Sequence, residues 1–470
     1  MGWLGLALFP LIGLAMVVTG LPAFLVLIGA AAIGAVAIVA AGDGALLGAL
    51  TGRYVNLFES DLLQALPLFV LMGMLVYRLP LADILFRAGC RIFGARAASP
   101  PAAALTLGAL LAPMNGSVGA SVAVLSRSVR PMLAKAGAPA AERVALLAAA
   151  STLGVVTPPS LVLLLLGDAM MGAHTIATNL AGRADRIVNT QDVFRAVLAP
   201  AALTLALWLV IAARSGRKTK GAEAPPGLSL GESLVAAAVV GFILTVLGGV
   251  AAGYFYAVEA AAMGCVTLFS AAALSRRLDR ATLAAIVADA IALSGALFAL
   301  LLAATTFTLV LRVLGSDRLL IDLIASLPGG PGVTLLAALV IVMASALALD
   351  AFEIIFVVVP VVMPGVLLRA PDAPWVAALT LLALQASYLM PPLGYALVMS
   401  RAAEPDHVAS RALARALAPY LGALMAVMLL AAAFPGVTHF GASSPTAPAT
   451  PPEAREVVVP MPDEAPPPKF

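Results

Sequence analysis

Residues 112–121 have the sequence APMNGSVGAS, a small, polar, glycine-rich break inside a very apolar region. Apolar runs flank the break on both sides, at residues 102–111 and 122–125. Neither run approaches the roughly 20 residues that a membrane-spanning helix needs. Two short arms joined by a polar turn predict a re-entrant hairpin, because non-helical backbone at membrane depth is tolerated only inside protein or beside a wet cavity. Carbonyl and hydroxyl oxygens in such a break suit a bare cation, and helix N-termini there suit an anion.

The composition places the chain in the membrane. Of 470 residues, 62% are hydrophobic and only 11% are charged, which no soluble domain could solvate. Lys and Arg gather near residues 87–96, 214–220 and 276–280, and the positive-inside rule predicts these loops to be cytoplasmic. The net charge of +3 arises from such loops, so we expect no nucleic-acid partner.

Hydropathy divides the chain into two halves and predicts an all-α polytopic membrane protein with about 11 transmembrane helices and two re-entrant hairpins. The predicted parts are a first half (1–213) with hairpin 1 (about 100–133) and a broken helix (143–172), a basic linker (214–228), a second half (229–434) with hairpin 2 (about 350–368) and a broken helix (375–400), and a tail (435–470). The tail is rich in Pro, Ala and Glu, so we expect it to be disordered.

The two halves repeat one plan. Asn115 and Pro158 are 43 positions apart, and Asp350 and Pro391 are 41 positions apart. Each half therefore has a polar hairpin followed, at nearly the same spacing, by a helix interrupted at a Pro-Pro pair, where proline removes backbone donors. Corresponding Pro-interrupted segments indicate the substrate site of a transporter. We expect the repeat to be inverted, although hydropathy leaves open the number of spans that decides this.

These breaks supply the candidate binding residues. We predict that Asn115, Ser160 and Asp350 face the substrate. The candidate Na⁺ ligands are carbonyl or hydroxyl oxygens from the same breaks: Gly116, Ser117, Ser121, Thr157, Pro158, Ser387, Pro391 and Gly394. An intramembrane carboxylate such as Asp350 is a functional hypothesis by default, because its burial is costly.

Each candidate also has a structural interpretation. The small residues near Asn115 resemble a helix-packing motif, and Ser160 is able to bond its own helix backbone. Asp350 is able to cap a hairpin helix at the interface, and Glu353 is able to pair with an arginine. The three histidines are isolated in sequence, and the chain has no Gly-x-x-x-x-Gly-Lys-Ser/Thr phosphate loop. We therefore predict neither a catalytic base nor ATP hydrolysis by this chain.

Five segments occur together in a characteristic order: LPLF (66–69), NGS (115–117), LG (153–154) with PPS (158–160), EAA (259–261) and PPLG (391–394). In this order they resemble the large membrane subunit of tripartite ATP-independent periplasmic (TRAP) transporters, over roughly residues 1–435. The resemblance implies sodium-coupled uptake of a small organic acid by an elevator mechanism in the bacterial inner membrane. It also implies two partners, a small four-helix membrane subunit and a periplasmic substrate-binding protein, with membrane lipid around the helices.

Two further segments resemble one branch of that family. Residues 349–354 and the long insertion 168–195 are similar to the branch labelled mannitol/chloroaromatic or α-keto acid. The chain departs from the family at Asn115, where the tip usually begins with serine, and at residues 256–258, which are usually Thr-Pro-Thr.

Two alternatives stay open at this point. One is a stand-alone sodium- or proton-coupled carrier of the dicarboxylate or antiporter type, which would have no neighbouring gene for a binding protein. The other is a membrane-embedded transferase, which would need an acid–base or metal cluster at one interface.

Overall fold

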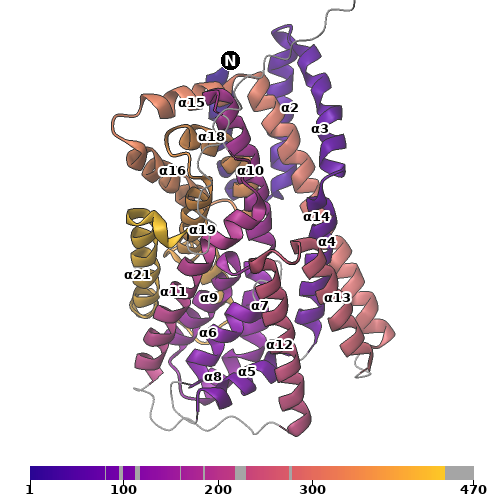
Figure 1. Ribbon diagram of the computed structural model, residues 1–470, viewed down its shortest axis with the longest axis vertical. Helices are drawn as coiled ribbons and strands as arrows, with labels where there is room; N and C mark the ends of the chain where they lie inside the picture. Colours follow the sequence, from indigo (N-terminus) through magenta and orange to yellow (C-terminus); the bar gives the residue numbers. More distant parts are fainter. Residues whose placement is uncertain are drawn as a thin grey trace, which may run out of the picture. The chain divides into compact units, whose positions relative to one another are not determined.

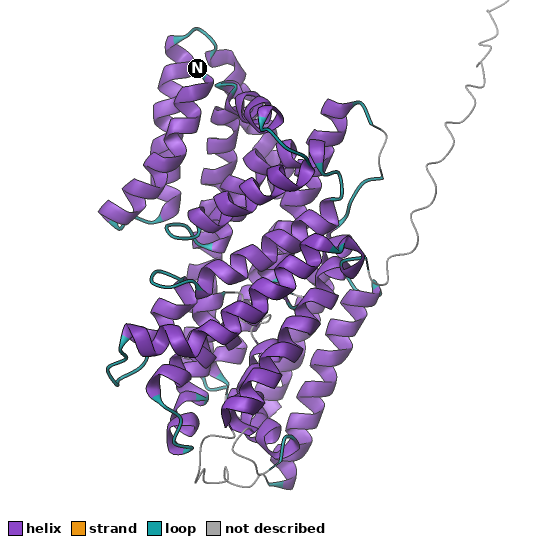
Figure 2. Ribbon diagram, turned by 90° about the vertical axis from the view of Figure 1, so that its left-hand side faces the viewer, coloured by secondary structure: helices purple, strands orange, loops and turns teal. Residues whose placement is uncertain are grey.

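The computed structural model describes residues 1–79, 81–94, 99–111, 117–158, 160–183, 186–216, 229–274 and 278–439. Within these ranges the regular secondary structure consists of helices joined by loops, without strands (Figure 2), which confirms the predicted all-α fold. Asn115 and Gly116, most of the basic linker and the tail from residue 440 lie outside the described residues, so the predictions for them stay predictions.

Figure 1 shows the helices coloured and labelled in their order along the chain. In the first half they are α1 (Gly2–Thr19), α2 (Ala23–Ala40), η1 (Gly44–Gly48), α3 (Ala49–Phe58), α4 (Asp61–Arg78), α5 (Leu81–Ile92), α6 (Ser99–Leu111), α7 (Val118–Ser128), α8 (Arg130–Lys135), α9 (Ala140–Val156), α10 (Leu161–Ala181) and α11 (Thr190–Gly216). In the second half they are α12 (Leu230–Ala252), α13 (Ala257–Leu274), α14 (Arg280–Val313), α15 (Ser316–Ser326), α16 (Pro331–Ser345), α17 (Ala351–Glu353), the π-helical η3 (Ile354–Val358), α18 (Val359–Arg369), α19 (Ala373–Leu389), α20 (Tyr395–Ala402), α21 (Ser410–Ala433) and η4 (Pro435–Val437).

Many of these helices are long enough to cross a bilayer. Among the described residues, eight are long and apolar enough, and nine if the bent pair of η1–α3 and α4 counts as one span. The apolar helices α6, α13, α16 and α19 are shorter or less continuous, and they make up the further candidates. The expected total of about 11 spans stays a prediction.

The region predicted as the second hairpin forms a helical run that packs against a neighbouring helix. Residues 350–368 were predicted to form the whole hairpin, but residues 351–369 form one helical run through α17, η3 and α18. The neighbouring helix is α16, and the Arg369 guanidinium at the end of α18 donates to the Thr334 hydroxyl at the start of α16, at 2.9 Å. The predicted hairpin bounds of 350–368 stay a prediction, and within them the structure shows one continuous helical run with α16 packed beside its end. Both α16 and the run from 351 to 369 are apolar, so hydropathy does not show which of them spans and which turns back.

Two broken helices form the centre of the bundle. Every residue from 143 to 156 in α9 and from 376 to 389 in α19 is buried. A helix that is apolar and buried on all sides belongs in the core. The break after α9 comes at Pro158, and the break after α19 comes at Pro391. Each proline lacks the backbone N–H that a continuing helix would use.

Close approach and a buried ion pair hold these core helices. A Cβ atom at Gly108 of α6 would lie 2.3 Å from the Ala150 carbonyl oxygen of α9, so only glycine allows this contact. At the start of α9, Arg143 donates two hydrogen bonds to the buried Glu404 after α20, at 3.1 and 2.6 Å. The two broken helices are thereby joined at their outer ends.

The helices pack as two groups. The scaffold group consists of α1–α4 and α13–α15, in which α14 packs along α2 and α4, and α13 along α4. The hairpin group consists of α5–α11 and α16–α21, with α9 and α19 at its centre. The helix α12 belongs to neither group and packs against α5, α11 and α13. The groups meet where α15 and α14 contact α18 and η3, and where α4 contacts α7 and α10.

Candidate functional site

Four helices begin at the breaks predicted from the sequence. Their N-cap residues are Ser117 for α7, Ser160 for α10, Asp350 for α17 and Gly394 for α20. The Ser117 hydroxyl accepts from the Ala120 N–H and the Ser160 hydroxyl from the Leu163 N–H, both at 3.1 Å. These hydroxyls therefore satisfy N–H groups that a helix start leaves free. The four caps are two matched pairs, with one member of each pair in each half.

Asp350 and Glu353 form a reciprocal capping box. The Asp350 N–H donates to the Glu353 carboxylate at 2.6 Å, and the Asp350 side chain accepts from the Glu353 backbone. The Tyr388 hydroxyl at the end of α19 donates to Asp350 Oδ1 at 3.2 Å. Within the described ranges neither carboxylate has a Lys, Arg or His partner. Two neighbouring carboxylates thus lie in an apolar bundle without a compensating cation from the described protein.

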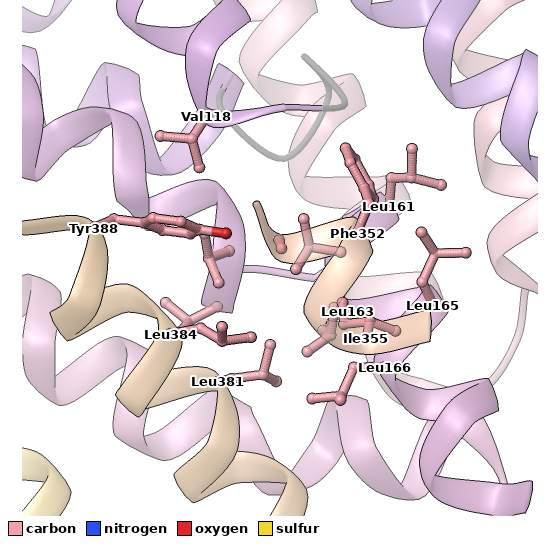
Figure 3. Packing of buried hydrophobic residues seen from close by; sticks show 14 of the residues in the cluster. Val118, Leu161, Leu163, Leu165, Leu166, Phe352, Ile355, Leu381, Leu384 and Tyr388 are labelled. Carbon is pink, nitrogen blue, oxygen red and sulfur yellow. The ribbon is translucent and has the colours of Figure 1, made fainter. Parts of the chain in front are cut away.

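Two tyrosines connect this carboxylate pair to the first hairpin. The rings of Tyr388 and Tyr395 pack at 6.2 Å between centroids. The Tyr395 hydroxyl lies 2.7 Å from where a Cβ would stand on Gly119, in the first turn of α7. Figure 3 shows Val118 of α7, Phe352 and Tyr388 gathered at one place, with the Tyr388 hydroxyl directed toward the segment that carries Phe352. The starts of α7 and α17 and the end of α19 therefore converge.

The predicted hydroxyl ligands make local hydrogen bonds. The Thr157 hydroxyl donates to the Leu153 carbonyl at 2.8 Å, Ser387 to Ala383 at 2.7 Å, and Ser121 to Ser117 at 3.1 Å. Ser160 bonds the backbone of its own helix, as its structural interpretation anticipated. Each of these hydroxyl oxygens keeps lone pairs that can accept or coordinate. Their roles as ligands stay predictions.

The proline and glycine positions of the two breaks differ in exposure. Pro158 is buried, whereas Pro391 is exposed at the second break. Gly394 is buried, and a Cβ on it would lie 2.5 Å from the Tyr388 carbonyl oxygen. The return of the chain over the end of α19 therefore requires glycine at this position.

Sequence reasoning missed three polar residues at this centre, namely Tyr388, Tyr395 and Gln385. Gln385 is fully buried in α19, and its Nε2 approaches the Thr152 hydroxyl of α9 at 3.5 Å. A polar side chain inside an apolar run is itself a functional signal in a membrane protein, and this signal would have identified Gln385. Tyr388 and Tyr395 lie on either side of the predicted break at Pro391, and polar hydroxyls beside such a break would have identified them as candidate site residues in the same way.

Broken apolar helices and helical hairpins that meet around polar groups inside the bundle are the architecture of a polytopic membrane transporter. Residues 11–437 match the family model described as the tripartite ATP-independent periplasmic transporter, DctM component, so the chain belongs to this family. The chain is therefore a large permease component of a transporter and not an enzyme, as predicted, and the transferase alternative is excluded. The family model does not distinguish branches, so the branch assignment stays a prediction.

Among solved structures, the chain is similar in fold to the YdaH transporter of Alcanivorax borkumensis, whose crystal structure shows an unusual topology. The match has a TM-score of 0.57 and 16% sequence identity, and it covers 84% of this chain and 89% of that one. No curated protein matches this sequence. Proteins of the DctM family work with a small membrane subunit and a periplasmic binding protein.

Proposed function

We propose that this chain imports a small organic acid into a bacterial cell across the inner membrane, driven by a sodium gradient. The observation that carries the proposal is the Asp350–Glu353 carboxylate pair at the start of α17, which has no cationic partner among the described residues. A substrate carboxylate would be repelled there, whereas Na⁺ would be attracted. The geometry therefore favours Asp350 as a cation ligand over its predicted direct contact with the substrate.

The other residues of the breaks fit such an ion. Hard cations prefer oxygen ligands, and carboxylate, hydroxyl and carbonyl oxygens are the donors present. Ser117 and Ser121 in the first half and Ser387 in the second supply hydroxyls near the convergence of α7, α17 and α19. Bound Na⁺ would supply positive charge that offsets Asp350 and attracts the acid. Ser160, at the start of α10, then becomes the candidate donor to the substrate, and the α10 N-terminus adds a favourable dipole.

The division into two helix groups supports an elevator-type movement. Both hairpins and both broken helices belong to the hairpin group, so the whole candidate site would move as one body past the scaffold group. Arg127 at the end of α7 donates to the Tyr77 carbonyl oxygen at the end of α4, and its guanidinium lies 4.9 Å from the Tyr77 ring centroid. This contact between the groups would be specific to one position of the hairpin group.

The distribution of basic residues predicts which end of the bundle faces the cytoplasm. The helices α5 and α8 lie at the end opposite the N-terminus (Figure 1), and they carry Arg87, Arg91, Arg130 and Lys135. By the positive-inside rule this end faces the cytoplasm. The end with α15 and the N-terminus then faces the periplasm, where a binding protein would deliver substrate.

Uptake by proteoliposomes tests the proposal. They would contain this chain, the small subunit and the binding protein encoded beside it, and labelled pyruvate and lactate would be the probes. Uptake that requires both an inward Na⁺ gradient and the binding protein is the expected result. Na⁺-driven uptake without the binding protein would instead support the stand-alone carrier. Equal uptake in Na⁺ and K⁺ would rule out sodium coupling.

A further inference from the structure

A cavity lies between the two helix groups, beside α18 of the second hairpin. It has a volume of about 680 Å³ and is lined by α3, α14 and α15 of the scaffold group and by α10 and α18 of the hairpin group. Its lining includes residues at the ends of α10 and α14 and at the start of α15, and α15 lies at the same end of the bundle as the N-terminus (Figure 1). The cavity therefore lies toward that end of the bundle rather than at its centre.

The deeper part of this cavity is apolar. Ile176 of α10, Leu309 of α14 and Val361 of α18 contribute to the lining, together with two prolines of α18. Leu309 lies one turn before Val313, the last residue of α14, so it is nearer the bundle interior. Such a surface suits a hydrocarbon chain and offers little to a small, polar organic acid.

The mouth of the cavity is cationic. Arg312 and Arg318 line it, with Asp317 as the one carboxylate in the lining. Arg312 and Asp317 are 3.8 Å apart at their charged atoms, and the Arg312 side chain is half-exposed. Asp322, one turn after Arg318, does not line the cavity. The lining therefore carries an excess of positive charge.

A third arginine reinforces this mouth. Arg53 lies one turn after the lining residue Ala49 on α3, within electrostatic range of Arg312 and Asp317. The hydrogen bond of 2.6 Å between the Tyr54 and Thr306 hydroxyls fixes α3 against α14. Arginine is the preferred side chain for phosphate, because its planar group forms two parallel hydrogen bonds.

We propose that this cavity binds an anionic phospholipid, with its phosphate at Arg312 and Arg318 and an acyl chain along Leu309 and Val361. Apolar lining beside two arginines matches the two parts of that molecule, because arginine pairs with phosphate and apolar side chains suit a hydrocarbon chain. Because the lining comes from both helix groups, the lipid bridges them in this arrangement.

Thermal unfolding of the purified full chain in detergent tests this site. Phosphatidylglycerol and zwitterionic phosphatidylcholine of equal chain length would be titrated separately. We expect phosphatidylglycerol to raise Tm well above the effect of phosphatidylcholine. The double variant Arg312→Gln/Arg318→Gln should lose most of this difference, whereas Arg411→Gln/Arg415→Gln, which removes two exposed charges from α21, should keep it.

Two further measurements test whether the bound phosphate group belongs to a lipid or to a free anion. Ala49→Phe adds a bulky side chain to the lining and should weaken the phosphatidylglycerol effect by filling part of the cavity, while leaving both arginines in place. Inorganic phosphate and pyruvate at matched concentrations should not reproduce the rise in Tm. If either does, or if the Arg312/Arg318 variant keeps the full phosphatidylglycerol effect, the lipid site is wrong. The measurement needs neither Na⁺ nor transport, so it stands or falls separately from the proposed function.

Discussion

The two breaks of this protein share a backbone plan and differ in charge. In the first half, α7 and α10 begin at Ser117 and Ser160, which satisfy the helix starts with neutral hydroxyls. In the second half the corresponding helices, α17 and α20, begin at Asp350 and Gly394. The same architecture therefore places a carboxylate pair on one side of the centre and hydroxyls on the other. The comparison teaches that a repeat can conserve geometry while its halves divide the chemistry.

The largest expected effect comes from removing the charge of the second half. Asp350→Asn keeps a good N-cap residue, so the helix start should survive. A hydrogen bond or ion contact to a charged group contributes about 1.5–3 kcal/mol, so losing the contact with Na⁺ and weakening the hydrogen bond from Tyr388 should reduce Na⁺-driven uptake by about 100-fold or more. The measurement is initial uptake of labelled substrate into proteoliposomes, normalised to inserted protein.

Asp289→Asn is the matched control for this variant. Asp289 pairs with Arg78 at 2.5 Å on the exposed surface of α14 and α4, so its neutralisation should change uptake little. Wild-type uptake by Asp350→Asn would show that the charge of the second break has no role in coupling.

Next in size is a steric test of the second break. Gly394→Ala would place a Cβ 2.5 Å from the Tyr388 carbonyl oxygen, and the resulting strain should cost roughly 1–3 kcal/mol or more. The Tm of Gly394→Ala, measured by differential scanning calorimetry, should fall below that of the wild type. Gly422→Ala on α21 meets no atom within 4 Å and should be neutral or stabilising, because alanine favours helix. Equal Tm values for the two variants would contradict the close return of the chain over α19.

A smaller effect is expected from Tyr388→Phe, which removes the hydroxyl that donates to Asp350. The loss of one hydrogen bond to a charged group corresponds to roughly a tenfold weaker apparent affinity for Na⁺. The Na⁺ concentration that gives half-maximal uptake measures this affinity. Tyr254→Phe, at a residue with 82% exposure, is the control and should leave it unchanged. If both variants show the same Na⁺ dependence, the hydrogen bond from Tyr388 to Asp350 does not contribute to Na⁺ binding.

The smallest effects distinguish the two serine caps of the first half. Ser117→Ala and Ser160→Ala should each lower stability by about 1 kcal/mol, because each removes an N-cap. Beyond this common loss, Ser160→Ala should raise the substrate concentration for half-maximal uptake, and Ser117→Ala should raise the Na⁺ concentration. Identical changes in both parameters would reduce the two serines to structural caps.

The sequence predicted the main features of the fold because they depend on local chemistry. Membrane helices follow from apolar composition, and the breaks follow from Pro158, Pro391 and the absence of their N–H groups. The caps at Ser160 and Asp350 lie at the positions that polar residues within apolar runs indicated. The family resemblance, built on short motifs, is confirmed by the match over residues 11–437.

Other features depend on contacts that hydropathy does not contain. The packing of α16 against the end of α18 depends on the Arg369–Thr334 contact, between residues 35 positions apart in sequence. Tyr388 and Tyr395 acquire their place only when α19 and α20 meet α7. The cavity beneath Arg312 and Arg318 likewise exists only where five helices come together.

Sodium binding by the purified chain tests the central claim most directly. Tm would be measured in rising NaCl with KCl keeping the ionic strength constant, for the wild type, Asp350→Asn and Asp289→Asn. The account predicts a saturable rise in Tm with Na⁺ for the wild type and Asp289→Asn, and its loss in Asp350→Asn. An equal Na⁺-dependent rise in Asp350→Asn would contradict the assignment of the coupling ion to the charged break of the second half.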